Sequence, residues 1–145
     1  MKTVDSINFA NKRAVIRVDF NVPLNEKYEV TDNTRIRATI PTIKKILKDG
    51  GSIVLMSHLG RPKEGPTNKY SLSHVVSEVS KQLGVPVLFA NDCISDDAYS
   101  KSGNLKSGEV LLLENLRFYK EEERGDETFA QKLSKHGSIY VNDAF

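Results

Sequence analysis

The sequence predicts an α/β protein built on a doubly wound parallel sheet, in the Rossmann-like three-layer α/β/α class. Five short runs rich in Val, Ile and Leu recur along the 145 residues. The runs are nearly continuous rather than alternating, which is typical of strands that helices cover on both faces. Segments with helical periodicity separate them in the order βαβαβαβαβ, and no internal repeat or low-complexity linker divides the chain.

Five predicted strands follow from the apolar runs. They cover residues 14–20, 52–57, 85–90, 109–115 and 138–145. The last run reaches the end of the sequence with no helix to close it, whereas doubly wound folds alternate strands with covering helices. We therefore expect residues 1–145 to form an incomplete domain of a truncated chain.

The clearest helix is predicted within residues 31–51. Its apolar stripe consists of Ile36, Ile40, Ile43 and Leu47. Asp32 or Asn33 can serve as the N-cap, and the glycine pair at 50–51 can end the helix. Pro41 cannot donate a backbone hydrogen bond, so a kink or a local rearrangement is expected there.

Three further helices are predicted between the later strands. Residues 71–84 begin with a serine cap and end at a glycine, and carry the stripe Leu72, Val75, Val76, Val79 and Leu83. A weaker helix is expected within residues 94–105. The fourth is expected within residues 126–137, where Phe129 and Leu133 share one face.

The composition indicates a soluble protein. Lys and Arg total 21 against 19 acidic residues, so the net charge is +2, and the charges are interspersed. Neither a nucleic-acid-binding arm nor a polybasic membrane segment is predicted. No apolar run approaches the ~20 residues of a membrane helix, and the N-terminus has no signal-like stretch. Cys93 is the single cysteine, so no intrachain disulfide can form, and a cytoplasmic location is expected.

The residues that follow the predicted strands suggest a binding site, because open parallel sheets bind ligands beyond the carboxyl ends of their strands. These residues are Asp19, Phe20 and Asn21; Ser57, His58 and Arg61; Asn91 and Asp92; Glu114, Asn115 and Arg117; Asn142 and Asp143. Arg35 joins them from the first turn of the first helix. Arginine and helix N-termini both suit oxyanions, so a phosphate or carboxylate is the expected ligand.

Other chemistry-bearing residues are assigned structural roles. His74 lies beside a valine stripe and His136 precedes a glycine that ends a helix, so packing or capping is expected for both. Cys93 is interpreted as a small buried hydrophobe rather than a nucleophile. The charged run at 121–124 is interpreted as a solvated loop.

Recognisable ATP-binding motifs are missing. Residues 60–67, GRPKEGPT, match the phosphate loop except that Pro66 replaces the essential lysine and also lacks a backbone N–H. No G-x-G-x-x-G follows the first strand either. A nucleotide site of either type is therefore not predicted in this chain.

Five longer motifs resemble the N-terminal half of the phosphoglycerate kinase family. They are RVDFNVPL (17–24), TDNTRIRATIPTI (31–43), SHLGRP (57–62), LLLENLRFYKEEE (111–123) and VNDAF (141–145). The motifs occur in the family's order and span almost the whole chain. The family pattern continues beyond VNDAF to a further histidine and arginine that hold substrate, and this sequence stops before them.

The resemblance implies a glycolytic enzyme that transfers a phosphoryl group reversibly between 1,3-bisphosphoglycerate and ADP, giving 3-phosphoglycerate and ATP. Residues 1–145 would be the incomplete N-terminal, phosphoglycerate-binding domain. The C-terminal domain, which would bind ATP or ADP with Mg, is expected to be absent from this chain, so the fragment alone is predicted to be inactive. No cofactor or metal site is expected in this chain, and a monomer is the family expectation.

The resemblance also implies site residues. Substrate contacts would come from Asp19, Phe20, Asn21, Arg35, His58, Leu59, Gly60, Arg61 and Arg117, with Phe20, Leu59 and Gly60 contributing backbone groups. Arg35 would be the catalytic residue, because phosphoryl transfer depends on neutralising charge on the moving group. The polar side chains in this set also belong to the edge that the strand pattern selects.

Two alternatives remain open at this point. The first is a non-catalytic anion-binding or nucleotide-binding module on the same fold, since a fold alone does not determine function. The second is an RNA-binding or scaffold role. The low net charge and the absence of a clustered aromatic and basic pattern argue against the second alternative.

Overall fold

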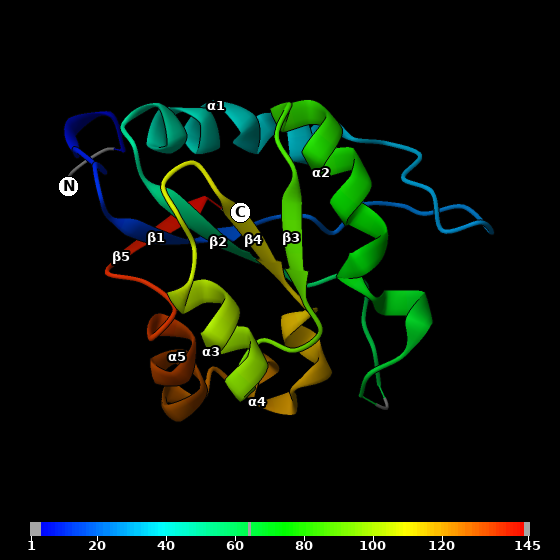
Figure 1. Cartoon of the computed structure of the whole chain (residues 1–145). Coiled ribbons are helices and arrows are strands. Elements are labelled where there is room, and N and C mark those ends of the chain that lie inside the picture. The colour runs from blue at the N-terminus through cyan, green and yellow to red at the C-terminus, as the bar shows by residue number, and fades with distance from the viewer. Residues whose placement is uncertain (1–3, 64, 144–145) are drawn as a thin grey trace.

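The computed structural model describes residues 4–63 and 65–143. Its centre is a five-stranded sheet in which all neighbouring strands are parallel, in the order β3-β4-β2-β1-β5. The strands are β1 (Arg13–Val18), β2 (Ser52–Met56), β3 (Val87–Ala90), β4 (Val110–Leu113) and β5 (Ile139–Asp143). Helices lie on both faces of the sheet (Figure 1), so the predicted three-layer α/β/α class is confirmed.

The helices divide between the two faces of the sheet. One face carries α1 (Thr34–Lys48) and α2 (Val76–Leu83), and the other carries α3 (Asp96–Gly103), α4 (Lys120–Glu123) and α5 (Glu127–Ser134) (Figure 1). Each face has its own apolar cluster. Alternate side chains of the central strands enter opposite clusters, as the two-residue period of a strand requires.

Burial is complete only at the centre of the sheet. Every residue of β2 and β4 is buried. The outermost strands are less covered, and Leu88 on β3 and Tyr140 on β5 expose 44% and 54% of their surface. The prediction that helices cover all five strands on both faces is therefore wrong for the two outermost strands, which have a strand neighbour on one side only.

The first helix begins and ends near the predicted positions. Asp32 Oδ1 accepts both the backbone N–H and the hydroxyl of Thr34, so Asp32 makes the expected side-chain contacts although Asn33 occupies the N-cap position. Gly50 follows the helix with a positive φ of 93°. The helix continues through Pro41. The proline cannot donate to the carbonyl of Arg37, but both residues are exposed, so water can reach that carbonyl.

Short 3₁₀ turns complete the chain path. They are η1 (Val4–Ser6), η2 (Asn68–Tyr70), η3 (Leu72–Val75) and η4 (Leu116–Phe118). The predicted helix at 71–84 thus starts as η3 and continues as α2. The loop predicted at 121–124 is wrong, because this run lies mainly in α4 and Glu122 makes an ion pair with Arg17 at 2.5 Å.

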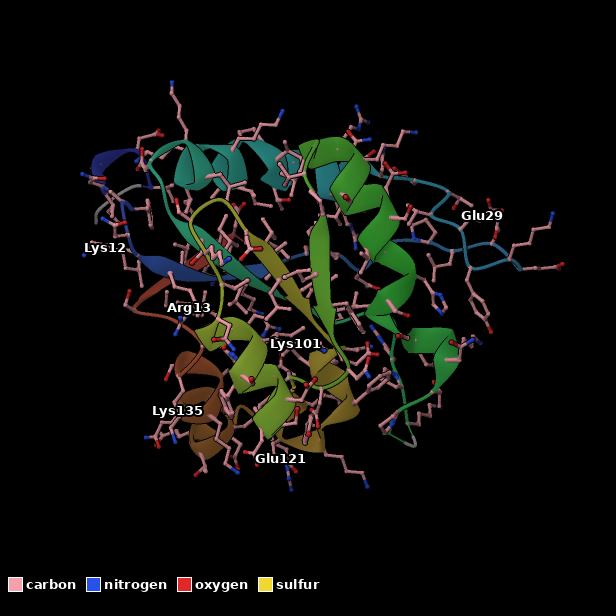
Figure 2. The ribbon with its side chains drawn as sticks, viewed as in Figure 1. Lys12, Arg13, Glu29, Lys101, Glu121 and Lys135 are labelled. Carbon is pink, nitrogen blue, oxygen red and sulfur yellow. The ribbon has the colours of Figure 1, made fainter. Side chains whose placement is uncertain are left out.

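Surface charge is dispersed over the molecule. Figure 2 shows Lys12, Glu29 and Lys135 at widely separated points, with Glu29 on the long loop after β1. No helix in the described residues is both long and apolar enough to span a bilayer.

Candidate functional site

The candidate site lies where neighbouring strands send their chains to opposite faces of the sheet. β2 leads to α2, whereas β4 leads to α4 and α5, although β2 and β4 are hydrogen-bonded neighbours (Figure 1). Such a switch point opens a crevice at the carboxyl edge of the sheet, where α/β proteins bind ligands. The loop after β1 borders the same edge, because β1 is the other neighbour of β2.

The loop after β1 is anchored to the loop after β2. The backbone N–H of Phe20 donates to Ser57 Oγ at 2.9 Å, and the Phe20 side chain is fully buried. Asp19 Oδ1 accepts the backbone N–H of Asn21 at 3.1 Å, which closes a local turn. Phe20 therefore fixes the loop to the core and holds Asp19 and Asn21 at the edge on either side of it.

Arg35 reaches the loop after β1 from the first turn of α1. Its NH1 group donates to the backbone carbonyl of Asn21 at 2.7 Å and lies 3.5 Å from Asp19 Oδ1. The Arg35 side chain is nevertheless 54% exposed. One contact orients the guanidinium, while most of its donors remain accessible to a ligand.

Gly60 brings the loop after β2 against the same group of residues. Its backbone N–H donates to Asn21 Oδ1 at 2.8 Å. It has a φ of +61°, and an added Cβ would lie 2.4 Å from the nearest ring carbon of Tyr70. Only glycine fits this position, because the backbone is left-handed and the aromatic ring lies directly against it.

His58 lies half-buried among charged groups. Burial is the main cause that lowers its pKa below the ordinary value of 6.5, and the positive charges of Arg117 and Arg17 lower it further. Asp19 and Glu122 oppose this shift. The neutral ring is therefore favoured in the free protein, and an arriving anion would raise the pKa and favour the protonated ring.

Arg117 belongs to the turn η4 that follows β4. Its NH1 lies 3.9 Å from Glu123 Oε1, a loose pair at a partly exposed position. Its Nε is buried and has no hydrogen-bond partner among residues 4–63 and 65–143. A buried donor of this kind is rare in native proteins and is available to an acceptor from a ligand.

The remaining edge residues are less closely tied to the crevice. Arg61 is exposed, and in the described part of the chain its side chain forms no ion pair or hydrogen bond. Asp92 accepts the hydroxyl of Tyr119 at 2.6 Å and follows the outermost strand β3. Asp143 is hydrogen-bonded to Thr42, and burial raises its pKa.

The two histidines and the cysteine that were assigned structural roles pack within the fold. The ring of His136 is fully buried and contacts Ser102 Oγ at 2.8 Å and the Cys93 carbonyl at 2.6 Å. His74 stacks on Tyr28 with ring centroids 4.3 Å apart. Cys93 is buried, and burial strongly raises the pKa of its thiol, which disfavours the reactive thiolate.

Two cavities meet at Asn21 and Val22. One, of about 510 Å³, is also lined by Arg35 and Thr34. The other, of about 470 Å³, is lined by Gly60 and the residues of the neighbouring loops. Both volumes lie in the range of small-molecule sites.

Comparison with known proteins identifies the family. A family model described as phosphoglycerate kinase matches residues 4–145. The chain belongs to the phosphoglycerate kinase family. Proteins named phosphoglycerate kinase from Porphyromonas gingivalis and Chloroherpeton thalassium are 49% and 51% identical to it, each over 99% of this chain. The match covers 40% and 36% of those proteins, so the chain spans well under half of their length.

Solved structures of phosphoglycerate kinases share the fold. The crystal structure of the enzyme from Pyrococcus horikoshii OT3 matches with a TM-score of 0.87 at 33% identity, covering 99% of this chain and 36% of that one. The structure from Coxiella burnetii matches with a TM-score of 0.83 at 34% identity, covering 95% of this chain and 34% of that one. Both matches agree with the α/β class predicted from the sequence.

A metal cage is not formed by the described residues of this phosphoglycerate kinase segment. No three His, Cys, Asp or Glu side chains in them gather closely enough to hold an ion.

Three residues support the site without belonging to the set that the resemblance implies; Ser57 and Asn115 were predicted at the edge of the sheet but given no role, and Arg17 was not predicted there. Arg17 pairs with Glu122 beside His58, and Ser57 anchors Phe20. Asn115 is 1% exposed and bonds to two loops. Ser57 follows β2 directly and Asn115 lies two residues after β4, which is the available sequence signal, but their partners lie far away along the chain.

Proposed function

We propose that this chain is the N-terminal, phosphoglycerate-binding part of a phosphoglycerate kinase. The complete enzyme would transfer a phosphoryl group reversibly between 1,3-bisphosphoglycerate and ADP, giving 3-phosphoglycerate and ATP, in glycolysis. One observation carries the proposal: in a member of this family, Arg35, His58 and Arg117 all lie at the switch-point edge of the sheet.

The affinity needed for such a substrate is modest. Micromolar to millimolar binding corresponds to about 4–8 kcal/mol. A hydrogen bond to a charged group contributes about 1.5–3 kcal/mol net. Two or three contacts from the exposed guanidinium of Arg35, the unpaired Nε of Arg117 and the ring of His58 would therefore be enough.

The proposed roles follow from charge and position. His58, Arg61 and Arg117 would hold the phosphate and carboxylate ends of phosphoglycerate. The Asp19 carboxylate would accept a hydrogen bond from the substrate hydroxyl, and the Asn21 amide would donate one to it. Backbone groups of Phe20, Leu59 and Gly60 would border the pocket. Burial lowers the pKa of His58 in the free protein, and binding of the anion would raise it and favour the charged ring.

Arg35 is the proposed catalytic residue. Phosphoryl transfer leaves little covalent work to the protein, and catalysis comes from positioning and from stabilising charge on the transferring group. The Asn21 carbonyl orients the Arg35 guanidinium, and the pair with Asp19 is loose at 3.5 Å. The guanidinium can therefore exchange its weak intramolecular partner for a phosphoryl oxygen.

The nucleotide is proposed to bind outside this chain. ATP or ADP with Mg would be held mainly by a C-terminal domain, so residues 1–145 alone would bind phosphoglycerate without turning it over. The segment is proposed to act as part of a cytoplasmic monomer.

Titration of the ¹⁵N-labelled chain with 3-phosphoglycerate tests the proposal. We expect shifts of the Gly60 and Arg117 amides and of the His58 ring, with saturation in the micromolar to millimolar range. An Arg117→Ala variant should bind at least about tenfold more weakly, because each lost charge-assisted contact is worth more than 1.4 kcal/mol. Lys135→Ala is the matched control and should bind normally, because Lys135 lies at the end of α5, away from the crevice (Figure 2).

Inorganic phosphate distinguishes the alternative function. A general anion-binding module would bind phosphate and 3-phosphoglycerate with similar affinity, because both offer the same dianionic group. The kinase proposal requires clear preference for 3-phosphoglycerate, whose carboxylate and hydroxyl make further contacts. Equal affinities, or shifts confined to residues away from the edge, would overturn it.

A further inference from the structure

Asn115 occupies the centre of the switch point. It lies two residues after the end of β4 and is 1% exposed. The adjacent residue Leu116 donates its backbone N–H to the Ser57 carbonyl at 3.0 Å, so the chains leaving β4 and β2 stay joined beyond the sheet. A buried amide at this point must find hydrogen-bond partners in the flanking loops.

The side chain of Asn115 uses both its donor and acceptor groups. Its Nδ2 donates to the carbonyls of Leu59 at 2.8 Å and Tyr70 at 2.9 Å. Its Oδ1 accepts the backbone N–H of Arg117 at 2.9 Å. The partners fix the orientation of the amide, because carbonyls require a donor and an N–H requires an acceptor.

These three bonds reach each wall of the crevice. The Leu59 carbonyl lies between His58 and Gly60 in sequence, and the Tyr70 ring packs on Gly60. Gly60 in turn donates to Asn21, whose carbonyl holds Arg35.

The bond from the Arg117 N–H to Asn115 Oδ1 reaches the other wall, because it starts the turn η4 that carries Arg117. One buried side chain therefore links the loops that present His58, Gly60 and Arg117.

We propose that Asn115 is a positioning residue of the phosphoglycerate site. It sets the spacing between the loop after β2, which carries His58, and the turn η4, which carries Arg117. Both residues can then contact one small anion. The inference rests on the proposed function, because it assigns Asn115 to that same site. In a catalytic site a misplacement of about 1 Å can lower the reaction rate about 10²-fold, so a residue that sets the spacing matters even without touching the ligand.

Asn115→Asp is the decisive variant. Aspartate has nearly the same shape and keeps an acceptor for Arg117, but it lacks both donors and turns a carboxylate toward two carbonyls. We expect 3-phosphoglycerate to bind at least tenfold more weakly, with the Gly60 and Leu59 amide signals displaced before ligand is added. Ser102→Ala, equally buried at 1% exposure in α3, is the matched control for lost stability and should bind normally.

The outcomes separate this inference from the proposed function. If the parent chain does not bind 3-phosphoglycerate, the proposed function fails first. If the parent binds and folded Asn115→Asp binds within twofold of it, the positioning role is wrong.

A measurement on the parent chain applies even if Asn115→Asp does not fold. The side-chain amide signals of Asn115 should shift on titration with 3-phosphoglycerate and remain unchanged on titration with NaCl at matched ionic strength. Signals that stay unmoved at saturation would overturn the inference.

Discussion

Arg35 combines a fixed orientation with a free charge. The Asn21 carbonyl accepts one of its N–H groups at 2.7 Å, yet 54% of the side chain is exposed. Exposed ion pairs such as the one with Asp19 contribute only ~0–1 kcal/mol to stability. Arg35 therefore contributes little to the fold, and its arrangement is better explained by a ligand.

Replacing Arg35 should separate catalysis from folding. In a full-length kinase that carries this segment, Arg35→Ala should lower kcat by about 10²-fold or more, because guanidinium groups on transferring phosphoryls contribute on that scale. KM for phosphoglycerate should rise less, and the melting temperature should change little. Steady-state kinetics and thermal unfolding measure these effects.

Arg37 supplies the control for this prediction. It lies on the same helix, is exposed, and donates its Nε to Asn33 Oδ1 at 2.8 Å rather than to the loop after β1. Arg37→Ala should therefore leave kcat unchanged. An unchanged kcat in Arg35→Ala would remove Arg35 from the catalytic role.

At the scale of loops and helix ends, two glycines share a left-handed backbone but differ in their surroundings. Gly60 has a φ of +61° with the Tyr70 ring against it, and Gly84 ends α2 with a φ of +76° and open space around it. An alanine at Gly84 should cost about 1–2 kcal/mol of stability, from the left-handed conformation alone. The same change at Gly60 adds a steric collision with Tyr70.

Gly60→Ala should therefore damage both the fold and the site. We expect a larger loss of unfolding free energy than for Gly84→Ala, measured by urea denaturation. Binding of 3-phosphoglycerate should weaken by about tenfold or more, because a displaced Gly60 N–H releases Asn21, whose carbonyl holds Arg35. One lost contact to a charged group costs about 1.5–3 kcal/mol, which is about tenfold or more in affinity. Gly84→Ala should bind like the parent. Equal affinities for the two variants would contradict the role of the Gly60 loop.

The helices of the second face are linked by a buried histidine. His136 follows α5, and its ring contacts Ser102 in α3 and the Cys93 carbonyl and stacks on Tyr99. Burial is the main cause that lowers its pKa below 6.5, and Arg13 lowers it further, while the bond to Cys93 opposes the shift. The folded protein thus favours the neutral ring.

Stability should consequently depend on this ring in mildly acidic solution. A folded-state pKa below 6.5 means that the unfolded chain binds the proton more readily, so the stabilisation is complete above pH 6.5. It is lost as the pH falls from 6.5 through the folded-state pKa, by about 1.4 kcal/mol per unit of pKa difference. His136→Gln should flatten the curve of unfolding free energy between pH 7 and 5.

His58 contributes to the same pH window. Burial also lowers the pKa of its ring below 6.5 in the folded protein, so His136→Gln should reduce the slope without abolishing it. If His136→Gln loses none of the slope, the His136 ring is not among the groups that titrate on unfolding.

At the scale of the whole molecule, the sheet class could be predicted and the strand order could not. Continuous apolar runs indicate buried parallel strands, but no local pattern shows that β4 lies between β2 and β3. Asp19, His58 and Arg117 could still be placed at one edge, because the carboxyl ends of parallel strands coincide in any order. Asn115 was not recognisable as their link, since its partners Leu59 and Tyr70 lie 56 and 45 residues away.

The same sheet also joins the two apolar clusters into one folding unit. Leu111 and Leu112 are consecutive on β4 and both are fully buried, but they belong to different clusters. Leu112 packs on the side of α1 and α2, and Leu111 on the side of α3 and α5. Because one backbone carries both side chains, neither cluster can open without disturbing the other.

Leu111→Ala and Leu112→Ala should therefore both lower a single unfolding transition. Each removes a buried leucine side chain and should cost about 2–5 kcal/mol, depending on how far the cavity collapses. Circular dichroism and tyrosine fluorescence should report the same urea midpoint within each variant, as expected for cooperative unfolding of a domain this small. Two separated transitions, with each variant shifting only one, would show that the two helical layers unfold independently and that the sheet does not couple them.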